Sequence, residues 1–208
     1  MRSLVLRGLT YYWRTNLAVV FGVATAVAVL AGALLVGDSV RGSLRDLVVG
    51  RLGKTDVLII SSGFFREQLA GDMQAQQSGA PKSLAPLIVA NAVVSVQQSG
   101  RKAAQVRVYA VDDRFWRFHG VESVSGPTER DAYVSPALAA QLAASPDEVI
   151  LVRVQRPTDI PLESLHGRRD EVGQTLRLTI RRVIPADLLG EFSLDATQSE
   201  IRAVFVPR

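Results

Sequence analysis

The sequence predicts a mixed α+β fold, in which one N-terminal transmembrane helix and an amphipathic stalk precede a domain with a mixed β-sheet. Residues 17–36 are an unbroken apolar run. The chain beyond residue 55 has several short runs of alternating apolar and polar residues, typical of strands with one buried face, and the helical patterns between them are short. Charged residues make up 21% of the 208 residues, which is near the soluble average and predicts no further set of spans.

The apolar run, LAVVFGVATAVAVLAGALLV, has the length and composition of a membrane-spanning helix. Twenty helical residues cover about 30 Å, the thickness of a bilayer's hydrocarbon core. Eleven of the twenty are Leu, Val or Phe, and each favours insertion by roughly 0.3–0.6 kcal/mol near the membrane centre. Backbone groups in lipid must bond to one another, so we predict that residues 17–36 form a helix in contact with membrane lipid.

Residues 1–16 are predicted to be an amphipathic segment at the membrane interface. Amphipathic rings and a basic residue, which favour the headgroup zone, stand directly before the span: Tyr11, Tyr12, Trp13 and Arg14. A cleaved signal peptide is the alternative, because residues 31–33 (AGA) resemble a cleavage site. The apolar run continues beyond that site, which favours an uncleaved span. Three arginines flank the span closely on each side, so charge leaves its orientation open.

Small residues recur every four positions inside the span, in two stripes: Ala18, Gly22 and Ala26, and Ala24, Ala28 and Gly32. Small side chains at this spacing let a second membrane helix approach closely. We therefore expect these residues to pack against another helix, although an Ala-rich anchor without a partner has the same composition.

Residues 37–55 are predicted to be a stalk helix and linker. Apolar residues return at helical spacing: Val40, Leu44, Leu47, Val48 and Leu52. Either Asp38 or Ser39 caps a new helix, or the span itself continues as the stalk. Gly50 and Gly53 are the expected helix stops.

Residues 56–208 are predicted to form the domain. A short helix is expected within 66–83, a turn or short helix at 112–120, and a helix over 137–144 that is capped by Ser135 and begins with Pro136. A polar loop is expected over 156–170. The strands are predicted at 56–61, 87–97, 103–111, 131–134, 148–155, 175–184 and 201–206, of which the second and third form a hairpin.

Candidate catalytic residues are few. His119 and His166 stand in no metal-ligand spacing, and we interpret both as surface or packing residues. Asp112 and Asp113 are adjacent at a strand end, where such residues usually make turns. No nucleophile-elbow, phosphate-loop or dinucleotide motif occurs. We therefore expect a protein that is not an enzyme and holds no cofactor or metal.

Three aromatic residues at 112–120 are the remaining candidates for a partner contact: Phe115, Trp116 and Phe118. Aromatic residues at a strand end more often belong to the core, and the core interpretation is favoured here. The net charge of +4 comes without a basic run or an RNA-binding motif, so no nucleic-acid partner is expected. The absence of cysteine excludes disulfides and thiolate chemistry.

The order of these features resembles the N-terminal half of permeases of the FtsX-like, MacB-like ABC transporter family. The resemblance rests on VYAVDDRFWRFHG, DAYVSPALAAQL, VGQTLRLTIRRVI and the closing AVFVPR. In that family, similar patterns belong to the periplasmic core domain. The patterns are loose, and they extend over essentially the whole chain.

The resemblance implies a cell-membrane protein with a cytoplasmic N-terminus and an extracytoplasmic domain at 56–208. It also implies homo- or hetero-dimers of permeases and a cytoplasmic ABC ATPase subunit that drives movement of the outer domain for export or substrate release. The family's three later spans and coupling loop are absent, so the chain is expected to be a fragment or truncated product. A single-pass sensor or adaptor, or a secreted domain cleaved after Ala33, are the alternatives.

The span predicts that the chain stays with the membrane pellet after a carbonate wash, because lipid-embedded helices are not extracted without detergent. Sedimentation followed by immunoblotting measures this. A chain that enters the buffer with its first forty residues intact contradicts the anchor. Mass spectrometry distinguishes cleavage, since a mature N-terminus near Leu34 would identify a secreted domain.

Overall fold

The computed structural model of the protein describes residues 11–61, 65–76, 83–154 and 174–208. The chain divides into two compact units, residues 1–47 and 48–208, which are taken here one at a time. Most of the predicted interfacial segment, the predicted loop over 156–170 and His166 lie outside the described residues.

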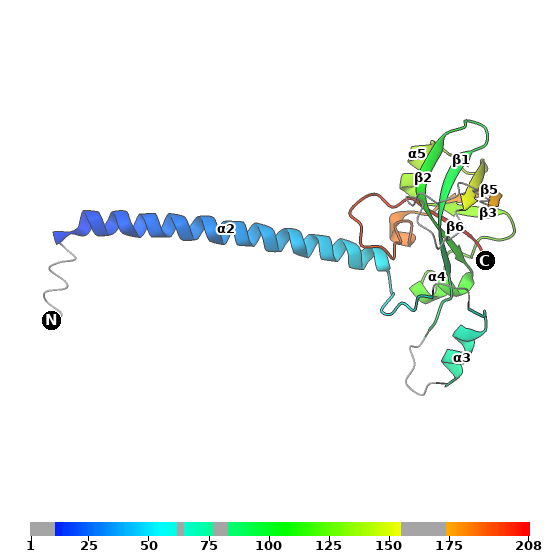
Figure 1. Cartoon of the computed structure of the whole chain (residues 1–208), viewed down its shortest axis with the longest axis horizontal. Helices are drawn as coiled ribbons and strands as arrows, with labels where there is room; N and C mark the ends of the chain where they lie inside the picture. The colour runs from blue at the N-terminus through cyan, green and yellow to red at the C-terminus, as the bar shows by residue number, and fades with distance from the viewer. Residues whose placement is uncertain (1–10, 62–64, 77–82, 155–173) are drawn as a thin grey trace, which may run out of the picture. The chain divides into compact units, whose positions relative to one another are not determined.

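One helix, α2 (Trp13–Leu52), runs through the predicted span and stalk without a break (Figure 1). Its 40 residues give a length of about 60 Å at the α-helical rise. By length and composition it can cross a membrane, and none of its residues is buried. The Thr25 hydroxyl donates to the Phe21 carbonyl at 2.8 Å, so the polar group within the apolar run is satisfied by the helix itself.

The continuity of α2 decides between the two predictions for the stalk. The stalk helix predicted within 37–55 is confirmed as far as Leu52, and it is a continuation of the predicted span. A new helix capped by Asp38 or Ser39 is wrong, because both residues lie inside α2, where the backbone amides are already bonded.

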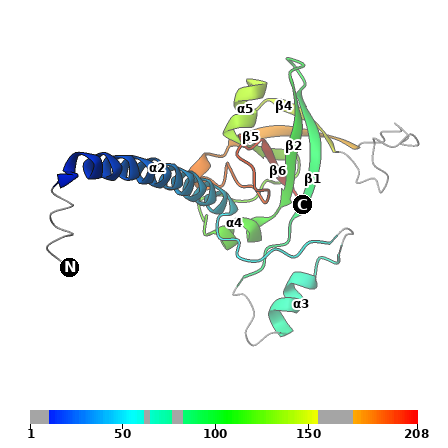
Figure 2. The ribbon, with the colours of Figure 1, turned by 60° about the vertical axis from the view of Figure 1, so that its left-hand side comes forward.

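The described part of residues 48–208 contains a closed barrel in the order β1-β2-β6-β3-β5-β4 (Figures 1 and 2). Two of its pairings are parallel, β2 with β6 and β3 with β5, and the others are antiparallel. The predicted α+β class with a mixed sheet is therefore confirmed, whereas closure into a barrel was not predicted. The strands are β1 (Ile88–Val96), β2 (Lys102–Val111), β3 (Asp131–Val134), β4 (Val149–Val154), β5 (Gln174–Val183) and β6 (Ala203–Pro207).

The predicted hairpin is confirmed as β1 and β2, which pair from Ile88 opposite Ala110 to Ser95 opposite Lys102. The register shifts between Ala92 and Val94, which is a β-bulge. A bulge increases local bend and twist, as closing a small barrel requires.

The barrel interior is filled by aliphatic side chains from the strands and from α5 (Pro136–Leu142). Leu138 and Leu142 of α5 are fully buried in this cluster, and α5 lies beside β2 (Figure 2). The predicted cap is confirmed, because the Ser135 hydroxyl accepts a bond from the Leu138 amide and Pro136 opens the helix. The same hydroxyl accepts the Ala203 amide at 3.0 Å, so it joins the helix to β6.

A second, aromatic cluster packs outside the barrel. It is covered by α4 (Asp113–His119) and by the segment around the short helix η1 (Ala186–Leu188). Its large buried side chains come from β2, α4, β6 and the segment after η1: Tyr109, Phe115, Trp116, Phe192 and Phe205.

Two predictions for residues 56–83 have different outcomes. A short helix is confirmed as α3 (Leu69–Gln76). The strand predicted at 56–61 is wrong, since these residues have no regular secondary structure. A β-branched run forms a strand only when a neighbouring strand satisfies its backbone, and none of the described strands pairs with it.

The packing of α5 predicts a large cost for Leu142→Ala. Removing a fully buried leucine side chain leaves a cavity in the barrel, which costs about 2–5 kcal/mol of unfolding free energy. Gln141→Ala, one position away on the exposed face, is the matched control and should change stability little. Thermal unfolding followed by near-UV circular dichroism measures both. Equal melting temperatures for the two variants would contradict the placement of α5.

Candidate functional site

The C-terminal end of α2 is built into the barrel unit by a set of contacts that we call the joint: Arg51, Gly53, Lys54, His119 and residues 189–197. The helix ends at Leu52, and the amides of Gly53 and Thr55 bond to the carbonyls of Gly50 and Leu52. Gly53 has a φ of +60°, in the left-handed region that ends helices and favours glycine. The predicted helix stop at Gly53 is confirmed, whereas Gly50 lies within α2.

Arg51 fixes the last turn of α2 through both its backbone and its side chain. Its carbonyl accepts the Ser193 amide at 3.1 Å, and its guanidinium donates to the Thr197 carbonyl at 2.6 Å. Its Nε lies 3.6 Å from a Glu191 carboxylate oxygen, and the arginine side chain is only 9% exposed. A charge this deeply buried is stable only with partners, so these contacts hold the helix end against the segment after η1.

His119, at the end of α4, holds the residue that follows the turn. Its Nδ1 accepts the backbone N–H of Lys54 at 3.1 Å, across 65 positions of sequence. The ring packs edge-on against Phe115, Phe118 and Phe192, with centroids 4.7, 5.0 and 5.2 Å away. The imidazole is therefore enclosed by aromatic carbon and held by one backbone bond.

Burial lowers the pKa of His119 to about 4, and the Lys54 ammonium adds to the effect. The ring is neutral at pH 7, as an Nδ1 that accepts a hydrogen bond requires. The space between Gly53 and the imidazole is also too small for a side chain, because a Cβ on Gly53 would lie 2.6 Å from His119 Nδ1. Position 53 thus needs glycine both for its φ and for the close approach of the imidazole.

Of the three aromatic residues predicted as a weak partner contact, two are buried and one is half-buried. Phe115 and Trp116 are fully buried in the aromatic cluster, so neither faces a partner, and that assignment is corrected. The core interpretation holds for both, because each ring packs against Phe205 of β6 in the aromatic cluster. Phe118 is half-buried against His119.

Asp112 and Asp113 do not form a catalytic carboxylate pair. Asp112 caps α4 by accepting the Arg114 amide, and Asp113 accepts the Gly126 amide at 2.7 Å. Partial burial acts to raise the pKa of Asp112, but the hydrogen bonds and charge of Arg114 together outweigh it and hold that pKa below its usual value. Both carboxylates therefore serve the fold.

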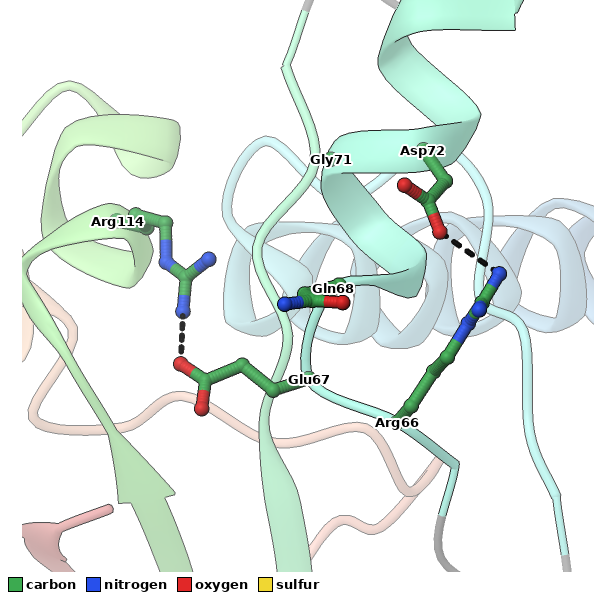
Figure 3. A pocket seen from close by; sticks show the side chains of 6 residues that line it. All are labelled: Arg66, Glu67, Gln68, Gly71, Asp72 and Arg114. Atoms are coloured by element: carbon green, nitrogen blue, oxygen red, sulfur yellow. Dashed lines mark ion pairs between the residues drawn. The ribbon is translucent and has the colours of Figure 1, made fainter.

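A shallow polar depression lies between α3 and α4 (Figure 3), and its charged side chains are paired. Arg114 reaches Glu67 at 3.5 Å, and Arg66 reaches Asp72 at 2.8 Å. Glu67 also pairs with Arg208. Within the described ranges, no group of three His, Asp or Glu residues can hold a metal ion. The depression therefore contains an ion-pair network and offers no unpaired charge to a ligand.

The predicted site residues of the N-terminal segment lie on or next to the exposed surface of α2. Tyr11, Tyr12 and Trp13 are exposed, and the Arg14 guanidinium carbon lies 5.8 Å from the Trp13 ring centroid. The small residues of both stripes are exposed on α2, and nothing lies within 4 Å of a Cβ built on Gly22 or Gly32. Helix packing and interface binding stay predictions.

Sequence reasoning interpreted His119 as a surface or packing residue and missed the joint. The hydrogen bond between His119 and Lys54 joins residues 65 positions apart, and the bond between Arg51 and Thr197 joins residues 146 positions apart. No local sequence pattern predicts contacts over such separations. The available signals were a glycine directly after a long helix and a histidine within an aromatic segment.

No protein-family model matches the chain, and no curated protein matches it either.

The environment of His119 predicts a pH dependence of stability. Because its folded pKa of about 4 lies below the usual 6.5, stability is complete above pH 6.5 and falls as the pH drops through that value towards 4. Between pH 6.5 and 5 the loss should be about 1.5 kcal/mol. His119→Gln should flatten this slope, measured by urea unfolding at each pH. An unchanged slope in the variant would show that His119 is not enclosed as described.

Proposed function

We propose that this chain is the N-terminal part of an ABC transporter permease subunit of the FtsX-like, MacB-like kind, and that it transmits movement between a membrane span and an extracytoplasmic domain. The observation that carries the proposal is the unbroken run of α2 from the apolar segment into the joint. The resemblance of the sequence to that family suggests the protein partner, a cytoplasmic ATP-hydrolysing subunit.

The stiffness of the connection supports a mechanical role. From Val36 to Leu52 the helix continues for sixteen residues, or about 24 Å. A flexible linker would absorb a displacement of the span, whereas a continuous helix passes it on. At its far end, a buried arginine and a backbone–histidine hydrogen bond fix the last turn and the following residue to the barrel unit. Movement of the helix end therefore moves that unit.

The proposed arrangement places the N-terminus in the cytoplasm, the span Leu17–Val36 in the cell membrane, and residues 56–208 outside the cytoplasm. ATP binding and hydrolysis by the partner subunit would bring permease subunits together and shift the helix. The outer domain would respond by changing its contacts with the exported or released substrate. The chain itself performs no chemistry in this proposal.

The cysteine-free sequence gives a direct test of the topology. Ser99→Cys, in the exposed turn between β1 and β2, should react with a membrane-impermeant maleimide in intact spheroplasts. Ser3→Cys, before the span, should react only after lysis. Mass-shift gels measure both. Protection of position 99 together with labelling of position 3 would reverse the orientation and contradict the proposal.

The permease assignment is tested at the native gene. The reading frame beyond Arg208 should encode three further apolar segments of about 20 residues, and the complete product should co-purify in detergent with an ABC ATPase. The reconstituted complex should hydrolyse ATP. A frame that ends without such segments, and a product that purifies without an ATPase, would instead favour an anchored sensor or adaptor.

A further inference from the structure

We propose that Arg114 and Arg208 form a binding site for a carboxylate side chain of an acidic partner polypeptide, and that Glu67 of this chain occupies the site until the partner binds. One oxygen of Glu67, Oε1, lies between the two guanidiniums, 3.5 Å from Arg114 Nη2 and 2.8 Å from Arg208 Nη2. Figure 3 shows the Glu67 and Arg114 side chains pointing toward each other. The chain's own carboxylate thus shows which chemical group the two arginines accept.

The two arginines are held in place by Asp112, independently of Glu67. Asp112 Oδ2 accepts hydrogen bonds from Nε and Nη2 of Arg114 at 3.0 and 2.6 Å, and from Nη1 of Arg208 at 3.4 Å. Asp112 itself is fixed as the cap of α4, and Arg208 follows directly after β6. The Arg208 side chain is only 17% exposed. The site is therefore preformed on the barrel unit, which lowers the cost of binding.

Glu67, in contrast, belongs to a segment that is weakly attached to the barrel unit. Its side chain is 70% exposed, and it lies in the turn before α3. No side chain of residues 65–76 belongs to the aliphatic cluster of the barrel or to the aromatic cluster. Among the described residues, the two ion pairs of Glu67 are the polar contacts that join 65–76 to the rest of the barrel unit. Exposed ion pairs are weak, so a second carboxylate can replace Glu67 at low cost.

The charges at the site favour a carboxylate over a phosphate. When Glu67 moves away, the two arginines and Asp112 leave one net positive charge, and an ionised carboxyl group carries one negative charge. A phosphate monoester carries about 1.5 to 2 negative charges, and it would lie beside the Asp112 carboxylate, which repels it. The site therefore fits the side chain of an Asp or a Glu.

The open shape of the site favours a polypeptide over a small molecule. The depression between α3 and α4 is shallow and polar, whereas small-molecule sites enclose most of the ligand surface. A polypeptide can add contacts beside the depression. Leu69 and Met73 lie one helical turn apart on α3 and are half-buried. Displacement of Glu67 frees α3 to present these two side chains to the same partner.

Binding of a fluorescein-labelled hexaglutamate peptide to the full chain in neutral detergent micelles tests the site, and fluorescence anisotropy measures it. Glu67→Gln keeps the size of the side chain and removes the competing charge. It should therefore raise the affinity about fivefold, the upper range for the loss of one exposed ion pair. Adding Arg208→Gln to this variant should remove the gain, and a gain that persists would contradict the site. A hexaglutamine peptide should not bind.

Asp72→Asn is the matched control, because it removes one negative charge from α3 but its partner is Arg66 within the same segment. It should leave the affinity for hexaglutamate nearly unchanged. An equal gain for both variants would assign the effect to net charge and overturn the proposal, and so would no gain for either. Release of the peptide by inorganic phosphate at a lower concentration than by propionate would identify a phosphate site and also overturn it.

The attachment of α3 gives a second measurement, since the cysteine-free chain accepts a single spin label at the exposed position 75. The label should become more mobile in Glu67→Gln and when the original chain is saturated with hexaglutamate, but not in Asp72→Asn. An unchanged spectrum in Glu67→Gln would show that Glu67 does not hold the segment, and the proposal would be wrong. No ATPase takes part in these measurements, so their failure leaves the permease proposal standing.

Discussion

The need of every backbone amide and carbonyl for a hydrogen-bond partner is the constraint on which this structure depends. Along α2 the helix itself supplies these partners, and it continues to Leu52. At its end, where the helix can no longer supply them, the barrel unit does so. The Arg51 carbonyl accepts the Ser193 amide, and the Lys54 amide donates to His119. The helix therefore ends where the folded unit provides the next set of partners.

The elements that the sequence predicted well are those with local signals. Alternation identified the β1–β2 hairpin, and Ser135 followed by Pro136 identified the start of α5, since both patterns act within a few residues. The closure of the barrel depends on β6, whose residues pair in parallel with a strand about a hundred positions earlier. Its run of four buried residues, Ala203–Val206, has no alternation, so the pattern gave no register.

The errors have physical causes as well. Residues 56–61 have strand composition but no strand neighbour among the described residues, and composition alone does not form a strand. At the candidate site, sequence reasoning interpreted His119 as a surface or packing residue because it stands in no ligand spacing, and the structure shows that it packs. It predicted Gly53 as a helix stop but not the close approach of His119 to that residue. It did not find Arg51, whose role depends on contacts with the segment after η1. Surface contact for Phe115 and Trp116 was contradicted because β2, β6 and Phe192 enclose both rings.

The pairing of β2 with β6 also determines the order of events during biosynthesis. Arg107 pairs with Ala203, 96 residues later, so the barrel has no closing strand until nearly all of the described chain has left the ribosome. Until then the edges of β2 and β3 are open, and open edges are prone to pairing with other chains. Contacts between distant residues also form slowly, since a long loop must be closed first. The nascent domain therefore keeps these strand edges exposed until β6 has been made.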